Sequence, residues 1–420
     1  MNTKATSPEF DFVENGGVTS PAGFQAAGIV CGLKKSGNPD FAMLFSKQPC
    51  HFAGTFTSNL FPAAPVQLCR ERCTKSETIR AVIVNSGIAN ACTGLTGYEN
   101  AAASAAKTAE VLGIAAEEVM VSSTGRIGIQ LPMDKIFSGI EKAAAALSDN
   151  GGSDAVAAIM TTDTRPKETA VTFTVPGTDG KKITIGGMTK GAGMIAPRML
   201  LAKPHATMLC YLTTDAEIDN DTLGCFLEEA VGNSFNRITV DNDMSTNDTC
   251  ILMANGASGV AVTKESGPLS KMFRKALKQV TEYLAKNMVM DGEGSTKLVS
   301  VEVSGAVSEE DARKCARAIA DSMLCKTAWF GCDTNWGRIL AAAGYSGATF
   351  SPENVNVDYD AKPVVRGGMD AGTAENELVE VLKQREFSIR IDLGAGSACH
   401  NVWTSDISYE YVKINADYHT

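Results

Sequence analysis

The sequence has little of what the commonest catalytic and metal sites are made from. Its 420 residues include only four histidines, and its twelve cysteines are spread thinly without a C-x-x-C pair. A zinc site of the Cys/His type therefore has few possible ligands. Scattered cysteines also do not form the framework of a small disulfide-rich protein. We expect no metal, no bound cofactor and no disulfide scaffold.

Long apolar runs and excess positive charge are also missing. No stretch approaches the roughly 18 apolar residues that span a bilayer, and the polar start lacks the apolar centre of a signal peptide. A formal net charge of −10 argues against nucleic acid or an anionic membrane as the main partner. With 44% hydrophobic and 20% charged residues, the composition is that of a globular protein. These features predict a cytoplasmic protein with two large lobes.

Segments typical of strands and helices alternate along the chain, which predicts a layered α/β fold. Alanine-rich or amphipathic patterns indicate helices over 99–114, 133–149, 220–235, 269–288 and 309–324. Asn220 or Asp221 can cap the third of these helices. Runs rich in β-branched residues indicate strands over 79–87, 170–177, 181–188, 207–214, 237–243, 249–256, 297–305 and 387–394. The second and third of these strands flank a short turn and form a plausible hairpin, so we expect sheets with several antiparallel pairs.

Three familiar kinds of site can be tested against the sequence. No G-x-S-x-G motif occurs, and His205 lies in no recognisable catalytic setting. The segment GAGMIA (191–196) formally fits a dinucleotide-binding fingerprint and leaves a nucleotide-binding oxidoreductase as an alternative. Pro197 and Pro204, however, interrupt the helix that this fingerprint requires. The segment DNDMSTND (241–248) starts like a calcium loop but lacks its glycine and glutamate, and we expect a hydrogen-bond network there.

A threonine nucleophile remains possible. Thr207 follows a glycine- and proline-containing stretch and the small residue Ala206, and it begins an apolar strand. A neutral hydroxyl needs an adjacent base, and an N-terminal threonine carries one in its own α-amine, whose pKa is about 7.7–8.0. This use of Thr207 requires the chain to be cut after Ala206. Taken alone, the pattern is also compatible with an ordinary buried strand residue.

The order of motifs along the chain resembles the ornithine acetyltransferase family, the bifunctional glutamate N-acetyltransferases of cyclic arginine biosynthesis. The similarity extends over essentially the whole chain. It is carried by GGVTSPAGFQAAGI (16–29), VNSGIANACTG (84–94), SSTGRIG (122–128), TTDTRPKE (161–168), KGAGMIAP (190–197), ATMLCYLTTDA (206–216), DNDMSTNDT (241–249), DGEGSTK (291–297), NWGRILAAAGYSG (335–347) and YVKINADYHT (411–420).

The resemblance implies the self-cleaving α/β fold that this family shares with certain aminopeptidases. It implies autocleavage between Ala206 and Thr207, which gives an α chain (1–206) and a β chain (207–420) that assemble as an α₂β₂ heterotetramer. It further implies ping-pong transfer of acetyl from N²-acetyl-L-ornithine to L-glutamate through Thr207, with acetyl-CoA as a possible second donor. An aminopeptidase or amidase of the same superfamily, in which water is the acceptor, is the closest alternative.

The resemblance also assigns site residues by position. Thr124 and Gly125 match the pair that forms the oxyanion hole. The positions that contact substrate are matched by Thr161, Lys190, Thr207, Glu293, Asn415 and Thr420. Lys190 can pair with an α-carboxylate and Glu293 with a cationic amine, which suits an amino-acid substrate.

Overall fold

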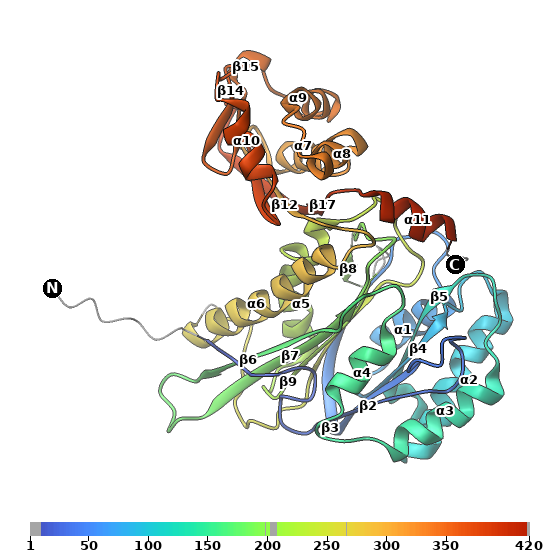
Figure 1. Cartoon of the computed structure of the whole chain (residues 1–420). Helices are drawn as coiled ribbons and strands as arrows, with labels where there is room; N and C mark the ends of the chain where they lie inside the picture. The colour runs from blue at the N-terminus through green and yellow to red at the C-terminus, as the bar shows by residue number, and fades with distance from the viewer. Residues whose placement is uncertain (1–9, 198, 202–207, 266, 418–420) are drawn as a thin grey trace.

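The computed structural model describes residues 10–197, 199–201, 208–265 and 267–417. They form one ten-stranded and one seven-stranded sheet, both covered by helices (Figure 1). The predicted layered α/β fold with many antiparallel pairs is confirmed. No helix within the described residues is long and apolar enough to cross a membrane.

The elements have the following bounds. The helices are α1 (Ala64–Lys75), α2 (Gly94–Leu112), α3 (Met133–Ala145), α4 (Gly152–Ile159), α5 (Asn220–Gly232), α6 (Pro268–Met290), α7 (Glu309–Ala320), α8 (Met323–Gly331), α9 (Trp336–Tyr345), α10 (Glu375–Leu382) and α11 (Tyr409–Asp417). The strands of the larger sheet are β1 (Asp11–Phe12), β2 (Phe24–Ile29), β3 (Phe41–Phe56), β4 (Ile79–Ile88), β5 (Val119–Arg126), β6 (Lys167–Thr174), β7 (Lys182–Lys190), β8 (Leu200–Leu201), β9 (Leu209–Thr214) and β11 (Thr249–Ala254). The strands of the smaller sheet are β10 (Ile238–Thr239), β12 (Leu298–Ala306), β13 (Asn356–Tyr359), β14 (Lys362–Arg366), β15 (Met369–Asp370), β16 (Glu386–Asp392) and β17 (Ala398–Ser405).

The larger sheet has the strand order β1-β6-β7-β9-β11-β3-β4-β5, with β2 and β8 also paired to β3. The long strand β3 joins its two halves: the first part pairs with β2 and β4, and the second part pairs with β11. The predicted hairpin is confirmed, because β6 and β7 pair antiparallel. Strand β9 pairs in parallel with β11, and β4 pairs in parallel with β5. Within each of these pairs the carboxyl ends of both strands lie at the same end of the pair.

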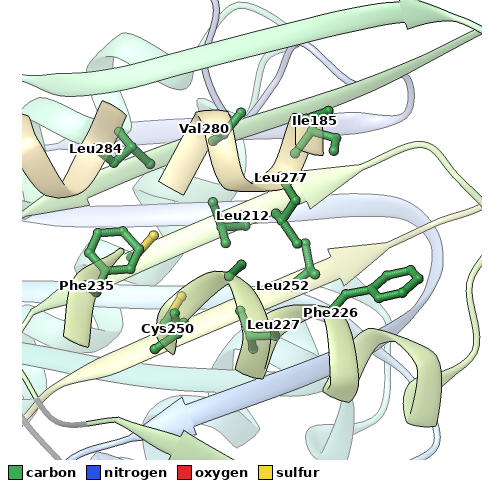
Figure 2. Packing of buried hydrophobic residues seen from close by; sticks show 14 of the residues in the cluster. Ile185, Leu212, Phe226, Leu227, Phe235, Cys250, Leu252, Leu277, Val280 and Leu284 are labelled. Carbon is green, nitrogen blue, oxygen red and sulfur yellow. The ribbon is translucent and has the colours of Figure 1, made fainter. Parts of the chain in front are cut away.

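Alternating side chains of β9 and β11 pack on opposite faces of the larger sheet. Leu212 and Leu252 point toward α5 and α6, where they meet Leu277 and Leu284 (Figure 2). Tyr211 and its neighbours on β11 pack on the opposite face with residues of β2, β4 and α4. Both faces of these central strands are therefore buried, which explains why their sequences are almost entirely apolar.

The smaller sheet and helices α7–α10 form a second unit with its own core, at the top of the view in Figure 1. The predicted cleavage point after Ala206 does not separate the two units. Strands β9 and β11, which follow it, lie between β7 and β3, which precede it. If the chain is cut after Ala206, the predicted α and β chains share the larger sheet.

Two helices have a cap that differs from the sequence-based expectation. Helix α5 is capped by Asp219, whose carboxylate accepts from Thr222 N at 2.8 Å, and neither Asn220 nor Asp221 is the cap. The helix predicted over 309–324 ends at Ala320, because Ser322 accepts from Cys325 N at 3.3 Å and starts α8. In both places a capping side chain one or two residues away determined where the helix begins.

Candidate active site

A cavity of about 220 Å³ opens where the ends of several elements meet. Its wall includes the end of β5, the end of β7, the loop after α6 and the C-terminal helix α11. The lining residues are Thr124, Gly125, Ile127, Thr161, Thr162, Lys190, Gly193, Met194, Ser245, Asn247, Glu293 and Asn415. Six of the predicted site residues thus meet in one cavity, although almost 300 positions separate the first from the last in the chain.

The remaining predicted residues, Ala206, Thr207 and Thr420, lie outside the described residues. Met208 directly follows the predicted nucleophile, and its carbonyl accepts from Thr249 N at 2.7 Å. Asn247, two residues before Thr249, lines the cavity. Met208 is therefore hydrogen-bonded to the segment whose Asn247 lines the cavity.

Lys190 is the buried cation of the cavity. Its Nζ donates to Thr161 Oγ1 at 2.8 Å and to Thr124 Oγ1 at 3.2 Å, and the residue is 6% exposed. Burial lowers the pKa of Lys190, whereas the carboxylate of Asp163 works against that shift. A buried ammonium whose visible partners are two neutral hydroxyls can accept a further, anionic partner.

An ion-pair cluster behind Lys190 was not found from the sequence. Lys167 Nζ lies 2.6 Å from Asp163 Oδ1 and also contacts Asp291, and all three side chains are buried. Asp163 further accepts from Gly191 N at 2.7 Å and from Thr161 N at 2.9 Å. Burial acts to raise the pKa of Asp163, but the two lysines hold that pKa below its ordinary value. The cluster fixes the backbone of Thr161 beside the end of β7.

Gly125 occupies a backbone position that other residues could not share. Its φ is +122°, and an added Cβ would lie 2.4 Å from the carbonyl carbon of Gly87 on β4. The β4–β5 register shifts at this point, and such irregularities often turn backbone groups toward a site. The arrangement brings the backbone at Thr124 and Gly125 against the cavity, where donors could stabilise an oxyanion.

Glu293 and Asn415 also line the cavity. Asn415 Nδ2 donates to Glu293 Oε2 at 2.8 Å, and Glu293 N donates to Ala192 O at 2.9 Å. Helix α11, which carries Asn415, has no buried residue and is tied down by Ser408 Oγ, which donates to Gly294 O at 2.6 Å. These hydrogen bonds hold the Glu293 carboxylate at the cavity.

Asn247 braces the cavity and was also not singled out from the sequence. Its Nδ2 donates to Ala89 O at 2.6 Å and to Ser123 O at 2.8 Å, and its Oδ1 accepts from Thr246 Oγ1 at 2.6 Å. The expected hydrogen-bond network in 241–248 is therefore confirmed. No cluster of three or more metal-ligating side chains occurs within the described part of the chain.

The sequence profile of the ArgJ family matches residues 25–420. The chain belongs to the ArgJ family.

Close relatives match almost the full length of this ArgJ chain. The arginine biosynthesis bifunctional protein ArgJ of Symbiobacterium thermophilum is 47% identical over 407 residues, which cover 96% of this chain and 99% of that protein. The glutamate N-acetyltransferase of Methanocaldococcus jannaschii is 46% identical over 417 residues, covering 97% and 100%. The crystal structure of ornithine acetyltransferase from Mycobacterium tuberculosis complexed with ornithine is 43% identical; it covers 45% of this chain and 99% of that chain, with a TM-score of 0.41.

The alternative based on GAGMIA is wrong for this ArgJ chain. A dinucleotide fingerprint must open a helix whose N-terminus faces the pyrophosphate. Residues 191–197 follow β7 as bends and extended chain without a helix. Gly193 instead makes room for Glu293, because an added Cβ would lie 2.4 Å from the Glu293 carboxyl carbon. Gly193 therefore serves the cavity.

Proposed function

We propose that the protein transfers acetyl from N²-acetyl-L-ornithine to L-glutamate through an acetyl ester on Thr207. The observation that carries this proposal is one cavity lined by both Glu293 and buried Lys190, whose Nζ donates to the hydroxyls of Thr161 and Thr124. Such a pair of opposite charges suits the α-carboxylate and a cationic amine of an amino-acid substrate. Membership of the ArgJ family, with relatives named glutamate N-acetyltransferase, supports the same reaction.

In the first half-reaction, Thr207 Oγ attacks the acetyl carbonyl carbon while its proton passes to the α-amine of Thr207. The negative charge that develops on the carbonyl oxygen is stabilised by donors at Thr124 and Gly125, where the loss of one such donor costs about 3–4 kcal/mol. The C–N bond then breaks, the α-amine returns a proton to the leaving nitrogen, and ornithine departs. In the second half-reaction, the glutamate amine attacks the ester and Thr207 Oγ leaves with the proton.

The free α-amine requires self-cleavage between Ala206 and Thr207, and we include this step in the proposal. The two products, 1–206 and 207–420, would remain together because they share the larger sheet. We further propose that two copies of each chain form an α₂β₂ heterotetramer in the cytoplasm, and that acetyl-CoA is a second donor, as the word bifunctional in the relatives' names suggests.

Two measurements test the proposal. Intact-mass analysis of active protein should give two chains with Thr207 as a new N-terminus, and Thr207→Ala should give one uncut, inactive chain. Release of ornithine from N²-acetyl-L-ornithine beyond one equivalent per active site should require glutamate as acceptor. Release that ignores glutamate would replace the transferase with an amidase, and active material consisting of one uncut chain would remove the mechanism.

A further inference from the structure

Asp241 holds two consecutive backbone groups of the cavity wall. Its Oδ2 accepts from Met194 N at 2.6 Å, and its Oδ1 accepts from Ile195 N at 2.8 Å. We call these two hydrogen bonds the Asp241 clamp. Met194 has a φ of +56°, a left-handed conformation that is unfavourable for a side chain of this kind and persists only where surrounding contacts enforce it.

The clamped segment, Ala192–Ile195, is the part of the cavity wall that contacts Glu293. Gly193 and Met194 line the cavity, and Glu293 N donates to Ala192 O at 2.9 Å. The carboxyl group of Glu293 lies so close to Gly193 that even a Cβ there would collide with it. A shift of the segment Ala192–Ile195 would therefore move the Glu293 carboxylate as well.

Neighbouring contacts align the same two stretches of chain over a longer distance. Val240 N donates to Ile195 O at 2.7 Å. Asn236 brackets Met199 through both of its amide atoms: Oδ1 accepts from Met199 N at 2.5 Å, and Nδ2 donates to Met199 O at 2.7 Å. Residues between Asn236 and Asp241 thus hold Met194, Ile195 and Met199 in place, and the clamp is the contact nearest the cavity.

We infer that Asp241 is a positioning residue for acetyl transfer, which acts by fixing the left-handed turn at Met194 and thereby the Glu293 carboxylate. This inference rests on the proposed function. Asp241 itself is not among the residues that line the cavity, so its effect reaches the substrate only through the clamped segment. The ionised carboxylate is the form that can accept both N–H groups with both oxygens, whereas a protonated carboxyl has one acceptor fewer.

Within the described part of the chain, three titratable groups interact with Asp241: Asp243, Lys326 and Tyr411. Burial raises the pKa of Asp241 to about 6, although the backbone donors Ile195, Asp243 and Met194 oppose the shift. Asp243 adds a like charge. The ammonium of Lys326 on α8 interacts favourably with the Asp241 carboxylate, and Tyr411 on α11 has its pKa raised by burial and by Asp241, so its phenol is uncharged between pH 5 and pH 8. The clamp should therefore be intact at pH 8 and weakened at pH 5.

The experiment compares Asp241→Asn with the matched control Asp243→Asn, an exposed neighbour on the same loop. Initial rates of acetyl transfer to glutamate are measured from pH 5 to pH 8. We expect Asp241→Asn to lower kcat/KM by about tenfold at pH 8, because the amide has only one acceptor oxygen and its Nδ2 cannot accept from the second of the two N–H groups. Asp243→Asn should stay within about twofold of the unaltered enzyme. The ratio between the unaltered enzyme and Asp241→Asn should approach one at pH 5, where the carboxyl is protonated.

Hydrogen exchange of the peptide that covers 190–197 provides a readout that does not depend on activity. Protection at Met194 and Ile195 should fall in Asp241→Asn, and in the unaltered protein it should be lower at pH 5 than at pH 8 after correction for intrinsic exchange. The second comparison needs no variant to fold. Equal kcat/KM at pH 8, a ratio that does not change with pH, or unchanged protection would each overturn the inference. Failure of the unaltered enzyme to acetylate glutamate would overturn the proposed function instead, and the exchange data would still decide the clamp.

Discussion

At the scale of single residues, the buried ammonium of Lys190 is the group that we expect to bind the α-carboxylate of the substrate. Lys190→Met keeps the length of the side chain and removes the ammonium, so we expect kcat/KM to fall by roughly 30- to 150-fold, equivalent to about 2–3 kcal/mol. KM should rise for both N²-acetyl-L-ornithine and glutamate, because both present an α-carboxylate to the same cation. Lys182→Met, on the exposed start of the same strand, is the control, and a similar loss there would contradict the assignment.

Asp248 is a second residue whose burial has a measurable consequence. It is completely buried, and within the described part of the chain neither of its carboxyl oxygens has a hydrogen-bond partner. Burial raises the pKa of Asp248 well above its ordinary value, with Lys190 opposing the shift. The folded protein therefore retains this proton at pH values where the unfolded chain, with a pKa of about 3.9, has released it. This group makes the free energy of unfolding fall as the pH rises above about 4.

Asp248→Asn removes that dependence. We expect the variant to be more stable than the unaltered protein at pH 8, by on the order of 1–3 kcal/mol, and equally stable near pH 4. Urea unfolding at the two pH values measures the difference, with the exposed Asp179→Asn as control. An equal effect at both pH values would mean that packing, and not ionisation, sets the cost of Asp248.

The site residues show what a sequence can and cannot reveal at this scale. Positions such as Lys190 and Glu293 could be assigned because each lies in a recognisable motif. The partners that hold them could not, because Asp163 and Asp241 act through contacts with residues brought close only by the fold. Asp241 even lay in a segment whose pattern first suggests a metal loop. Its carboxylate accepts backbone hydrogen bonds from Met194 and Ile195, and no residue spacing in the sequence indicates such a role.

At the scale of elements, the cap of α5 provides a test of how the helix start is determined. Asp219→Ala should destabilise the protein by about 1 kcal/mol, because Thr222 N loses its acceptor. Asp221→Ala should cost only a few tenths of a kcal/mol, since that exposed residue contributes through the helix dipole alone. Thermal unfolding of the two variants, measured side by side, checks the prediction, and the reverse order would restore the cap that the sequence suggested.

Elements with one clear period were predictable, and elements shaped by context were not. The amphipathic pattern at 269–288 gave α6 with its ends within two residues. Strand β3, in contrast, runs unbroken through Ser46–Pro49, a polar stretch with a proline that is typical of a turn. The strand continues there because it passes from one set of partners, β2 and β4, to another, β11. The local sequence does not indicate that the strand changes its partner strands at this point.

At the scale of the whole molecule, the pairing of the central strands determines whether the two chains can separate after cleavage. β9 pairs with β7 on one side and with β11 on the other, and β11 pairs with β3. A cut after Ala206 would leave β9 and β11 in the later chain and β7 and β3 in the earlier one. The interface between the two chains is then the hydrophobic core itself, including the cluster in Figure 2, and separation would expose it to water.

We therefore expect the two chains of the processed protein to separate only when the protein unfolds. In size-exclusion chromatography they should elute together at low and at high salt, because the contact is apolar and is not weakened by screening. Across a urea series, loss of co-elution should coincide with loss of the far-ultraviolet circular dichroism signal, as in a single cooperative transition. Release of the 207–420 chain at a urea concentration where the secondary structure is intact would show that the shared sheet does not hold the two chains together.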